Sequence, residues 1–229
     1  FAGGNPVAAG GFVFLLIVLA VSITLLASFL LSKTILRGVP SAFVLELPPY
    51  RRPKLGEVIV RSMLDRTIFV LARAVTVAIP AGAVIWLCQN IMVNGHTLLY
   101  GMATLLEPLG ACMGLSGVIL MAFLLGIPAN EIVIPILLMV YSQSGTLVEA
   151  EGIAQAGAIL AANGWTWVTA VCVILFSLNH FPCATTLLTI RKETGSLLWT
   201  GVSFLLPTVV GMLLCIAVHL LALLVGIFF

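Results

Sequence analysis

The chain has 229 residues, of which 62% are hydrophobic and 8% are charged. Its mean hydropathy is +1.25, far outside the range of soluble proteins, so lipid is the solvent that such a chain needs. This composition leaves little room for a soluble domain and predicts an all-α fold: a single polytopic transmembrane domain over residues 1–229.

The basic residues, ten in all, fall in two segments of the sequence. They are Lys33, Arg37, Arg51, Arg52, Lys54, Arg61, Arg66 and Arg73 in the first segment, and Arg191 and Lys192 in the second. By the positive-inside rule both segments face the cytoplasm. We therefore expect residues 33–73 and 191–196 to be cytoplasmic. Topology alone accounts for these charges, so they do not indicate a nucleic-acid partner.

About four stretches are long enough to cross the membrane, which requires a helix of about 20 residues. They are residues 11–32, 74–93, 165–190 and 197–229. Prolines at 40, 48, 49 and 53 interrupt the connection between the first two. After them, a charged stripe repeating every four residues predicts a cytoplasmic amphipathic helix over residues 55–73 on the inner membrane surface. An ordinary solvated helix leading into the second span is the alternative.

Two segments contain no lysine or arginine, and we expect both to lie on the outer, non-cytoplasmic side of the membrane. The first, residues 94–114, contains His96 as a solvated loop residue and a short interfacial helix over residues 98–109. The second is the acidic loop over residues 142–163. Because both flank one apolar block, residues 115–141 are predicted to form a re-entrant hairpin of two half-helices with both ends outside.

The hairpin is expected to break at Gly126-Ile127-Pro128, immediately before Asn130 and Glu131. Glycine- or proline-interrupted hydrophobic segments are the best sequence indication of a transporter's binding site. Glu131 is the only carboxylate within an apolar block. A charge at that depth costs about 2.5 to 3.5 kcal/mol on insertion scales, so it usually faces a cavity, a partner or an ion. Capping of nearby amides is the structural alternative.

A second interruption lies at Pro182, within the third predicted span. If the helix continues, Asn179, Cys183 and Thr186 share one face, with His180 at its edge. Sulfur and imidazole favour a borderline divalent ion such as Fe²⁺ over Na⁺ or Ca²⁺. His180 could instead satisfy backbone groups released by the proline. Most of the five cysteines, and His219, are expected to be packing residues.

Four motifs resemble the C-terminal half of the membrane domain of the ferrous iron transporter B (FeoB) family, which is of the gate, or nucleoside-recognition, type. They are LELPPYR at 45–51, GIPANEIV at 126–133, FPCAT at 181–185 and RKETGS at 191–196. The resemblance implies Fe(II) transport into the cytoplasm across the bacterial inner membrane. It also implies control by an N-terminal GTP-binding domain and a first gate, on the same polypeptide or on a separate subunit.

In this family an acidic residue of the gate and a cysteine after proline are the suspected iron contacts, which correspond here to Glu131 and Cys183. Asn130, Asn179 and His180 complete the predicted metal site. Asn130 stands where many members have lysine. No G-x-x-x-x-G-K-[ST] motif occurs, so no nucleotide site is expected in this chain.

We therefore expect a fragment of an Fe(II) transporter that is not itself an enzyme, embedded in the lipid bilayer, with homo-oligomerisation left open. A nucleoside or other small-solute carrier is the first alternative, because asparagines such as Asn130 and Asn179 could recognise a base or sugar. A structural membrane assembly protein, whose broken helices serve only packing, is the second.

Overall fold

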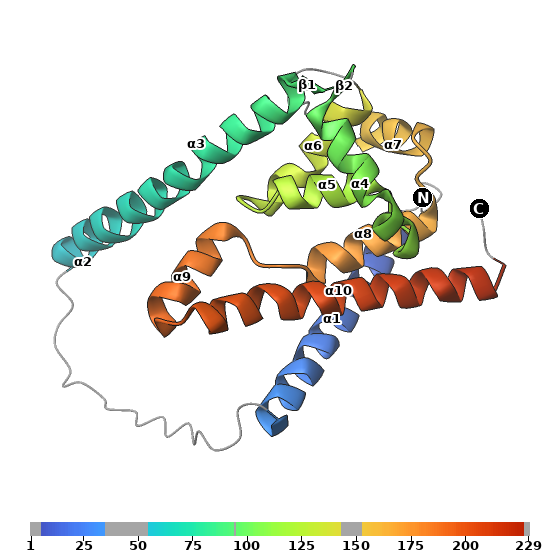
Figure 1. The fold of residues 1–229 in the computed structure, drawn as a ribbon. Helices are drawn as coiled ribbons and strands as arrows, with labels where there is room; N and C mark the ends of the chain where they lie inside the picture. The colour runs from blue at the N-terminus through green and yellow to red at the C-terminus, as the bar shows by residue number, and fades with distance from the viewer. Residues whose placement is uncertain (1–5, 35–54, 94, 143–152, 227–229) are drawn as a thin grey trace. The chain divides into compact units, whose positions relative to one another are not determined.

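The computed structural model describes residues 6–34, 55–93, 95–142 and 153–226, and these are almost entirely helical (Figure 1). The all-α class predicted from the sequence is confirmed. The LELPPYR motif at 45–51 lies outside the described residues. The chain divides into two compact units, one ending at Ala74 and the other beginning at Val75, and each is described separately below.

The first unit contains α1 (Pro6–Thr34), α2 (Leu55–Arg61), the π-helical segment η1 (Ser62–Ile68) and the start of α3 (Phe69–Asn90). Large apolar side chains of α1 are exposed, as expected for a helix that contacts lipid. The predicted helix over residues 55–73 is present. Its middle part is wound as the π-helical segment η1, in which i→i+5 bonding widens the turns.

The second unit holds the remaining elements. In chain order they are the rest of α3, β1 (Met92–Val93), β2 (His96–Thr97), α4 (Leu98–Cys112), α5 (Gly117–Leu125), η2 (Asn130–Ile132), α6 (Val133–Tyr141), α7 (Ile153–Ala162), α8 (Trp167–Asn179), α9 (Ala184–Thr194) and α10 (Leu197–Leu224). Most of the buried core is contributed by α5, α6 and α8.

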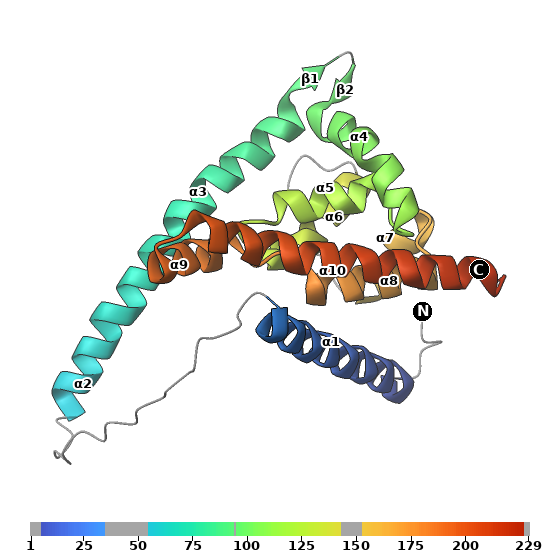
Figure 2. The same ribbon diagram turned by 60° about the horizontal axis from the view of Figure 1, so that its bottom comes forward.

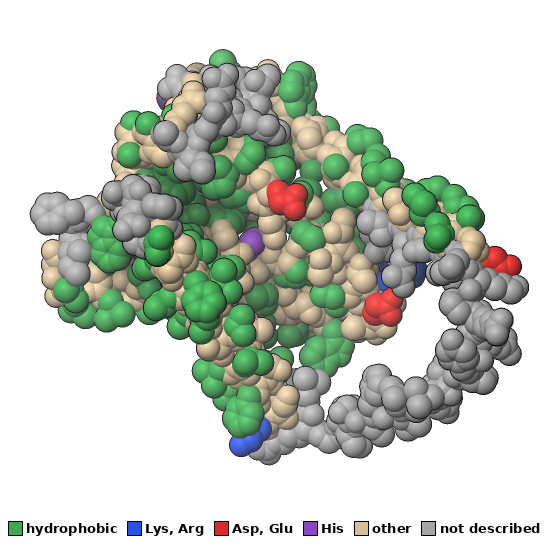
Figure 3. Space-filling model, turned by 180° about the vertical axis from the view of Figure 1, so that it is seen from behind, with side chains coloured by type: hydrophobic (Ala, Val, Ile, Leu, Met, Phe, Trp, Pro, Cys, Tyr) green, Lys and Arg blue, Asp and Glu red, His purple; other side chains and the backbone are tan. Residues whose placement is uncertain are grey.

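Three described stretches are long and apolar enough to cross a membrane, namely Ala9–Thr34, Trp167–Thr194 and Leu197–Leu224. A fourth arises if the bent pair α4 and α5 counts as one span. The predicted second span differs, since its apolar part, Ala74–Asn90, is shorter than these three. The face drawn in Figure 3 is largely hydrophobic, with isolated charged side chains, in keeping with a lipid environment.

Two predicted loops contain regular structure. His96 lies in the short strand β2, which pairs with β1 in an antiparallel register, and its ring stacks on Tyr100 at a centroid distance of 4.9 Å. The expected acidic loop over residues 142–163 includes the helix α7. The apolar run of α7 is only ten residues long, too short to read as a span, and the loop's two glutamates lie outside the described residues.

A tight elbow joins α4 to α5, which are bent by 113° relative to each other. Gly110 and Gly117 allow the two backbones to touch, since a Cβ on Gly110 would come within 2.8 Å of the carbonyl carbon of Ser116. The Glu107 carboxylate accepts a 2.7 Å hydrogen bond from the Gly117 amide at the start of α5. A negative charge there also suits the positive end of the helix dipole. Glu107 therefore has a structural role.

Replacing Gly117 by alanine should destabilise this elbow. Its Cβ would overlap the carbonyl oxygen of Ala103 and lie 2.7 Å from the Glu107 amide nitrogen. Backbone atoms cannot move aside as a flexible side chain can, so we expect a cost of about 1 to 3 kcal/mol. Thermal unfolding in detergent would measure it. Gly101→Ala, in the neighbouring helix α4 and with no atom within 4 Å of the new Cβ, should not lower the midpoint.

α8 and α10 run side by side in both views (Figures 1 and 2). Close approach is possible because Gly211 of α10 lies against the end of α8, where a Cβ would be 3.0 Å from the Asn179 carbonyl oxygen. Nearby, the Cys215 thiol donates to the Cys172 carbonyl at 3.3 Å, and the Cys172 thiol to the Cys215 carbonyl at 3.8 Å. These two thiols have the packing role expected for them.

Candidate functional site

The first break separates α5 from α6 within the predicted hairpin. α5 ends at Leu125, and helical structure resumes only with the short 3₁₀ turn η2 at Asn130–Ile132. Asn130 and Glu131 are both exposed at the start of this turn. The predicted position of the break at Gly126-Ile127-Pro128 is therefore correct, and the Glu131 carboxylate lies at the positive end of the resuming helix.

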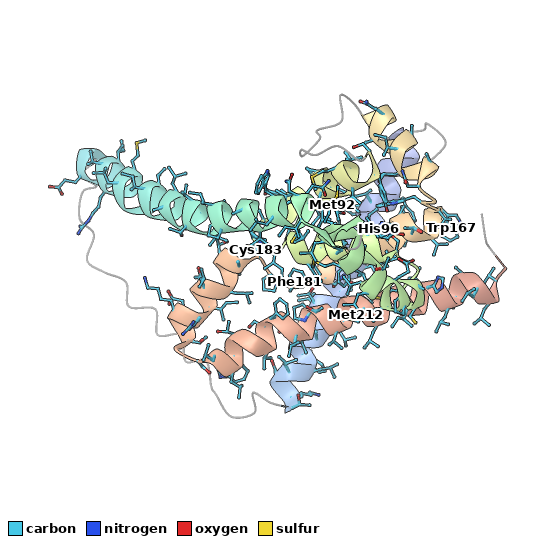
Figure 4. The ribbon with its side chains drawn as sticks, turned by 45° about the horizontal axis from the view of Figure 1, so that its top comes forward. Met92, His96, Trp167, Phe181, Cys183 and Met212 are labelled. Atoms are coloured by element: carbon cyan, nitrogen blue, oxygen red, sulfur yellow. The ribbon has the colours of Figure 1, made fainter. Side chains whose placement is uncertain are left out.

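The second break separates α8 from α9. α8 ends at Asn179, the segment from His180 to Cys183 is extended, and α9 begins at Ala184 with Cys183 as its N-cap residue. Pro182 lacks an amide hydrogen and disfavours helical geometry in the residue before it, which explains the interruption. Figure 4 labels Phe181 and Cys183 in this connection.

The two breaks are in direct contact. The Ala184 amide at the start of α9 donates a 2.9 Å hydrogen bond to the Ile127 carbonyl in the break between α5 and α6. Each break thus supplies a backbone group that the other would otherwise leave unpaired. This bond places the GIPANEIV segment at 126–133 and the FPCAT segment at 181–185, which are distant in the sequence, side by side.

Cys183 is half-buried, and its sulfur lies 3.1 Å from both the Thr185 and the Thr186 hydroxyl oxygens. The thiol therefore sits over the first turn of α9 among hydroxyl groups and the amide ends of a helix. The thiolate is the form of cysteine that binds metals, and hydroxyl groups and helix amides are donors that can hydrogen-bond to it. No side-chain cap is made by Cys183 itself.

Asn179 does not share a helix face with Cys183 and Thr186. The predicted alignment of Asn179 with Cys183 and Thr186 required a continuous helix, and α8 ends at Asn179 instead. The Asn179 side chain is 6% exposed and donates to the Leu175 carbonyl at 3.0 Å, so its amide nitrogen caps its own helix. Of that predicted face, only Cys183 and Thr186 stay together, in the first turn of α9.

His180 is 9% exposed and is surrounded by aromatic rings. Its centroid lies 4.8 Å from that of Phe181, 5.2 Å from Phe123 and 5.7 Å from Phe176. Nδ1 lies 2.9 Å from the Ser177 carbonyl oxygen, so the ring also caps α8. His180 therefore satisfies a backbone carbonyl near the break, which was the structural alternative considered for it. This role uses only one of its two ring nitrogens.

Within the described residues, no three side chains of His, Cys, Asp or Glu are grouped closely enough to hold a metal ion. The breaks instead offer an exposed carboxylate, a half-buried thiol and unwound backbone, which suits an open path better than a closed structural site. Sequence reasoning did not identify the Ile127 carbonyl or the aromatic rings around His180. The contact pairs residues distant in the chain, so no local spacing indicates it.

Taken together, the apolar spans and the paired breaks define a multi-pass helical membrane protein of the broken-helix type. Residues 13–66 match the family described as ferrous iron transport protein B C terminus, and residues 71–197 match the nucleoside recognition family, named Gate. The second match covers more than half of the chain, which therefore belongs to the nucleoside recognition family. The resemblance to FeoB drawn from the motifs is confirmed.

Several similar proteins are named Fe(2+) transporter FeoB. The one from Staphylococcus aureus (strain MSSA476) is 29% identical over 212 residues, covering 87% of this chain and 30% of its own length. The Synechocystis protein is 30% identical over 175 residues, covering 75% and 27%. The Methanocaldococcus jannaschii protein is 27% identical over 191 residues, covering 77% and 27%. This chain thus spans under a third of these relatives, and no solved structure matches it.

Proposed function

We propose that this chain forms part of a transporter that moves Fe²⁺ into the cytoplasm, with a site near the membrane midplane where the two helix breaks meet. The single observation that carries the proposal is the hydrogen bond from the Ala184 amide to the Ile127 carbonyl, because it brings both interruptions together. The identity of the proposed ion comes from the relatives, which are named Fe(2+) transporters.

In this proposal Glu131 supplies negative charge and Cys183 supplies a sulfur ligand. Carboxylate alone would favour hard cations, whereas thiolate shifts the preference toward later divalent metals. The exposed Asn130 amide lies beside Glu131 and could add an oxygen ligand. Asn179 lies immediately before the second break, where its amide oxygen could face the ion while its nitrogen donates to the Leu175 carbonyl.

The orientation follows from charge. Residues 33–73 and 191–196 would face the cytoplasm, because all lysines and arginines lie there. The α9 helix carries Arg191 and Lys192 in its last turn, so this half-helix, which begins at Ala184 just after Cys183, would lead from the site to the cytoplasmic surface. A GTPase domain and a first gate, on the same polypeptide or on a partner subunit, would control passage across a bacterial inner membrane.

Uptake into proteoliposomes containing the complete protein tests this function. A metal-quenched fluorophore inside the vesicles should report entry of Fe²⁺ kept reduced by ascorbate. Entry of Ca²⁺ should be far slower, since a site with a thiolate disfavours hard cations. Equal rates for the two ions, or no Fe²⁺ entry above protein-free vesicles in any nucleotide state, would contradict the proposal.

A nucleoside carrier is the second candidate, favoured by the name of the family that residues 71–197 match. Its distinguishing observation would be saturable uptake of radiolabelled uridine or adenosine by the same proteoliposomes, unaffected by an Fe²⁺ chelator. We expect no such uptake, because the relatives that match most of this chain are named Fe(2+) transporters.

A further inference from the structure

We propose that Nε2 of His180 is an occluded second ligand for a borderline divalent cation, and that the Phe181 ring is the cover that must move before the cation reaches it. This inference rests on the proposed transport function and adds a second station to it. The cation would first meet Glu131 and Cys183 and would then engage His180, three residues before the cysteine.

The hydrogen bond of the ring fixes which nitrogen is available. Nδ1 lies 2.9 Å from the Ser177 carbonyl oxygen. A carbonyl oxygen can only accept a hydrogen bond, so the proton must be on Nδ1. Nε2 of the neutral ring is then unprotonated and presents its lone pair. A metal-binding histidine commonly has this arrangement, with one nitrogen donating to a carbonyl and the other facing the metal.

Nε2 is the one buried side-chain nitrogen or oxygen in the described residues without a hydrogen-bond partner. The other buried polar side chain there, Asn179, has its nitrogen paired with the Leu175 carbonyl. Leaving a buried acceptor unpaired costs on the order of 1 to 3 kcal/mol. Such a cost in a native structure requires an explanation, and a ligand present in another state of the transport cycle provides one.

The three surrounding rings are all buried, but they belong to backbone of different kinds. Phe123 belongs to α5 and Phe176 to α8, whereas Phe181 belongs to the extended connection between α8 and α9. Phe181 stacks on Phe204 of α10 with centroids 5.0 Å apart. A side chain on non-helical backbone is the one that a small rearrangement of the break would displace first.

Space for that displacement exists beside the ring. A cavity of about 130 Å³ is lined by Phe123, Phe176 and Phe181, together with apolar residues of α4, α5 and α10 such as Met212. Figure 4 labels Phe181 and Met212, which both contribute to this lining. Thr208 is the one polar residue of the lining, and its hydroxyl already donates to the Phe204 carbonyl at 2.6 Å, so the phenyl ring could enter the cavity without displacing a hydrogen bond. The Nε2 lone pair would then be uncovered without unfolding either helix.

Binding of Co²⁺, which has ligand preferences similar to those of Fe²⁺ and visible absorption bands, tests the inference in the complete protein. Phe181→Ala should remove the cover and raise Co²⁺ affinity about tenfold, a change typical of groups around a metal site. The double variant Phe181→Ala with His180→Gln should lose that gain. Phe14→Ala, at an exposed position of α1, should leave affinity unchanged.

The proposal would be overturned if Phe181→Ala did not raise Co²⁺ affinity. It would also be overturned if Phe181→Ala raised that affinity equally with His180 present and with His180→Gln. Phe181→Leu provides a milder second variant that keeps most of the packing, and it should show a smaller gain with the same dependence on His180. The proposed transport site is tested separately, by Fe²⁺ uptake in Cys183→Ser. Failure of the His180 proposal in Co²⁺ binding can therefore be told from failure of the proposed transport function.

Discussion

Cys183→Ser should lower Fe²⁺ uptake by the complete protein about tenfold or more, by analogy with the loss that follows removal of groups around a metal. Serine keeps a polar group near the Thr185 and Thr186 hydroxyls but does not ionise at neutral pH. The start of α9 should remain intact, because Cys183 makes no side-chain cap and the Ala184 amide bonds to the Ile127 carbonyl through the backbone. The loss should therefore reflect the missing sulfur.

Two controls separate a lost ligand from a general defect. Cys112→Ser changes an exposed free cysteine at the end of α4, outside both breaks, and uptake should stay at the wild-type rate. Thermal unfolding of Cys183→Ser should match that of the wild type. Wild-type uptake by Cys183→Ser would remove Cys183 from the transport path.

The second large effect is expected for Glu131→Gln. This change keeps size and hydrogen-bonding capacity but removes the charge that would attract a cation and stabilise it away from bulk water. We expect Fe²⁺ uptake to fall about tenfold, with the apparent affinity for Fe²⁺ decreasing more than protein stability. Glu131 is exposed at the start of η2, so packing should be little affected.

Glu193→Gln is the matched control, since Glu193 is an exposed carboxylate near the end of α9. It should transport Fe²⁺ at the wild-type rate. If both glutamine variants lost uptake equally, the effect would reflect the overall charge of the protein and not a site at the first break.

Much of the fold could be predicted because lipid imposes strong rules on a sequence. Long apolar runs indicated three of the stretches that are able to cross a membrane, and Gly126 with Pro128 and Pro182 indicated both breaks. The α4 and α5 elbow was not predicted. It depends on contacts of Gly110 and Gly117 with a distant part of the backbone, and an isolated glycine in an apolar run does not reveal such a contact.

The candidate site was predicted in parts but not as an arrangement. Glu131 and Cys183 were identified because charge and sulfur are uncommon in apolar runs, and the site they would share stays a prediction. Helical spacing wrongly grouped Asn179 with Cys183, because Pro182 ends the helix between them. The unpaired nitrogen of His180 could not be foreseen, since its burial depends on phenyl rings from three separate segments.

A double-mutant cycle of Fe²⁺ uptake most directly tests whether the two breaks form one site. Uptake would be compared in the wild type, Glu131→Gln, Cys183→Ser and the double variant of the complete protein. Groups that act on the same ion are coupled, so their effects do not add independently. We predict that the double variant is nearly as active as the more damaged single variant. A double variant whose loss equals the product of the two single losses would contradict a shared site.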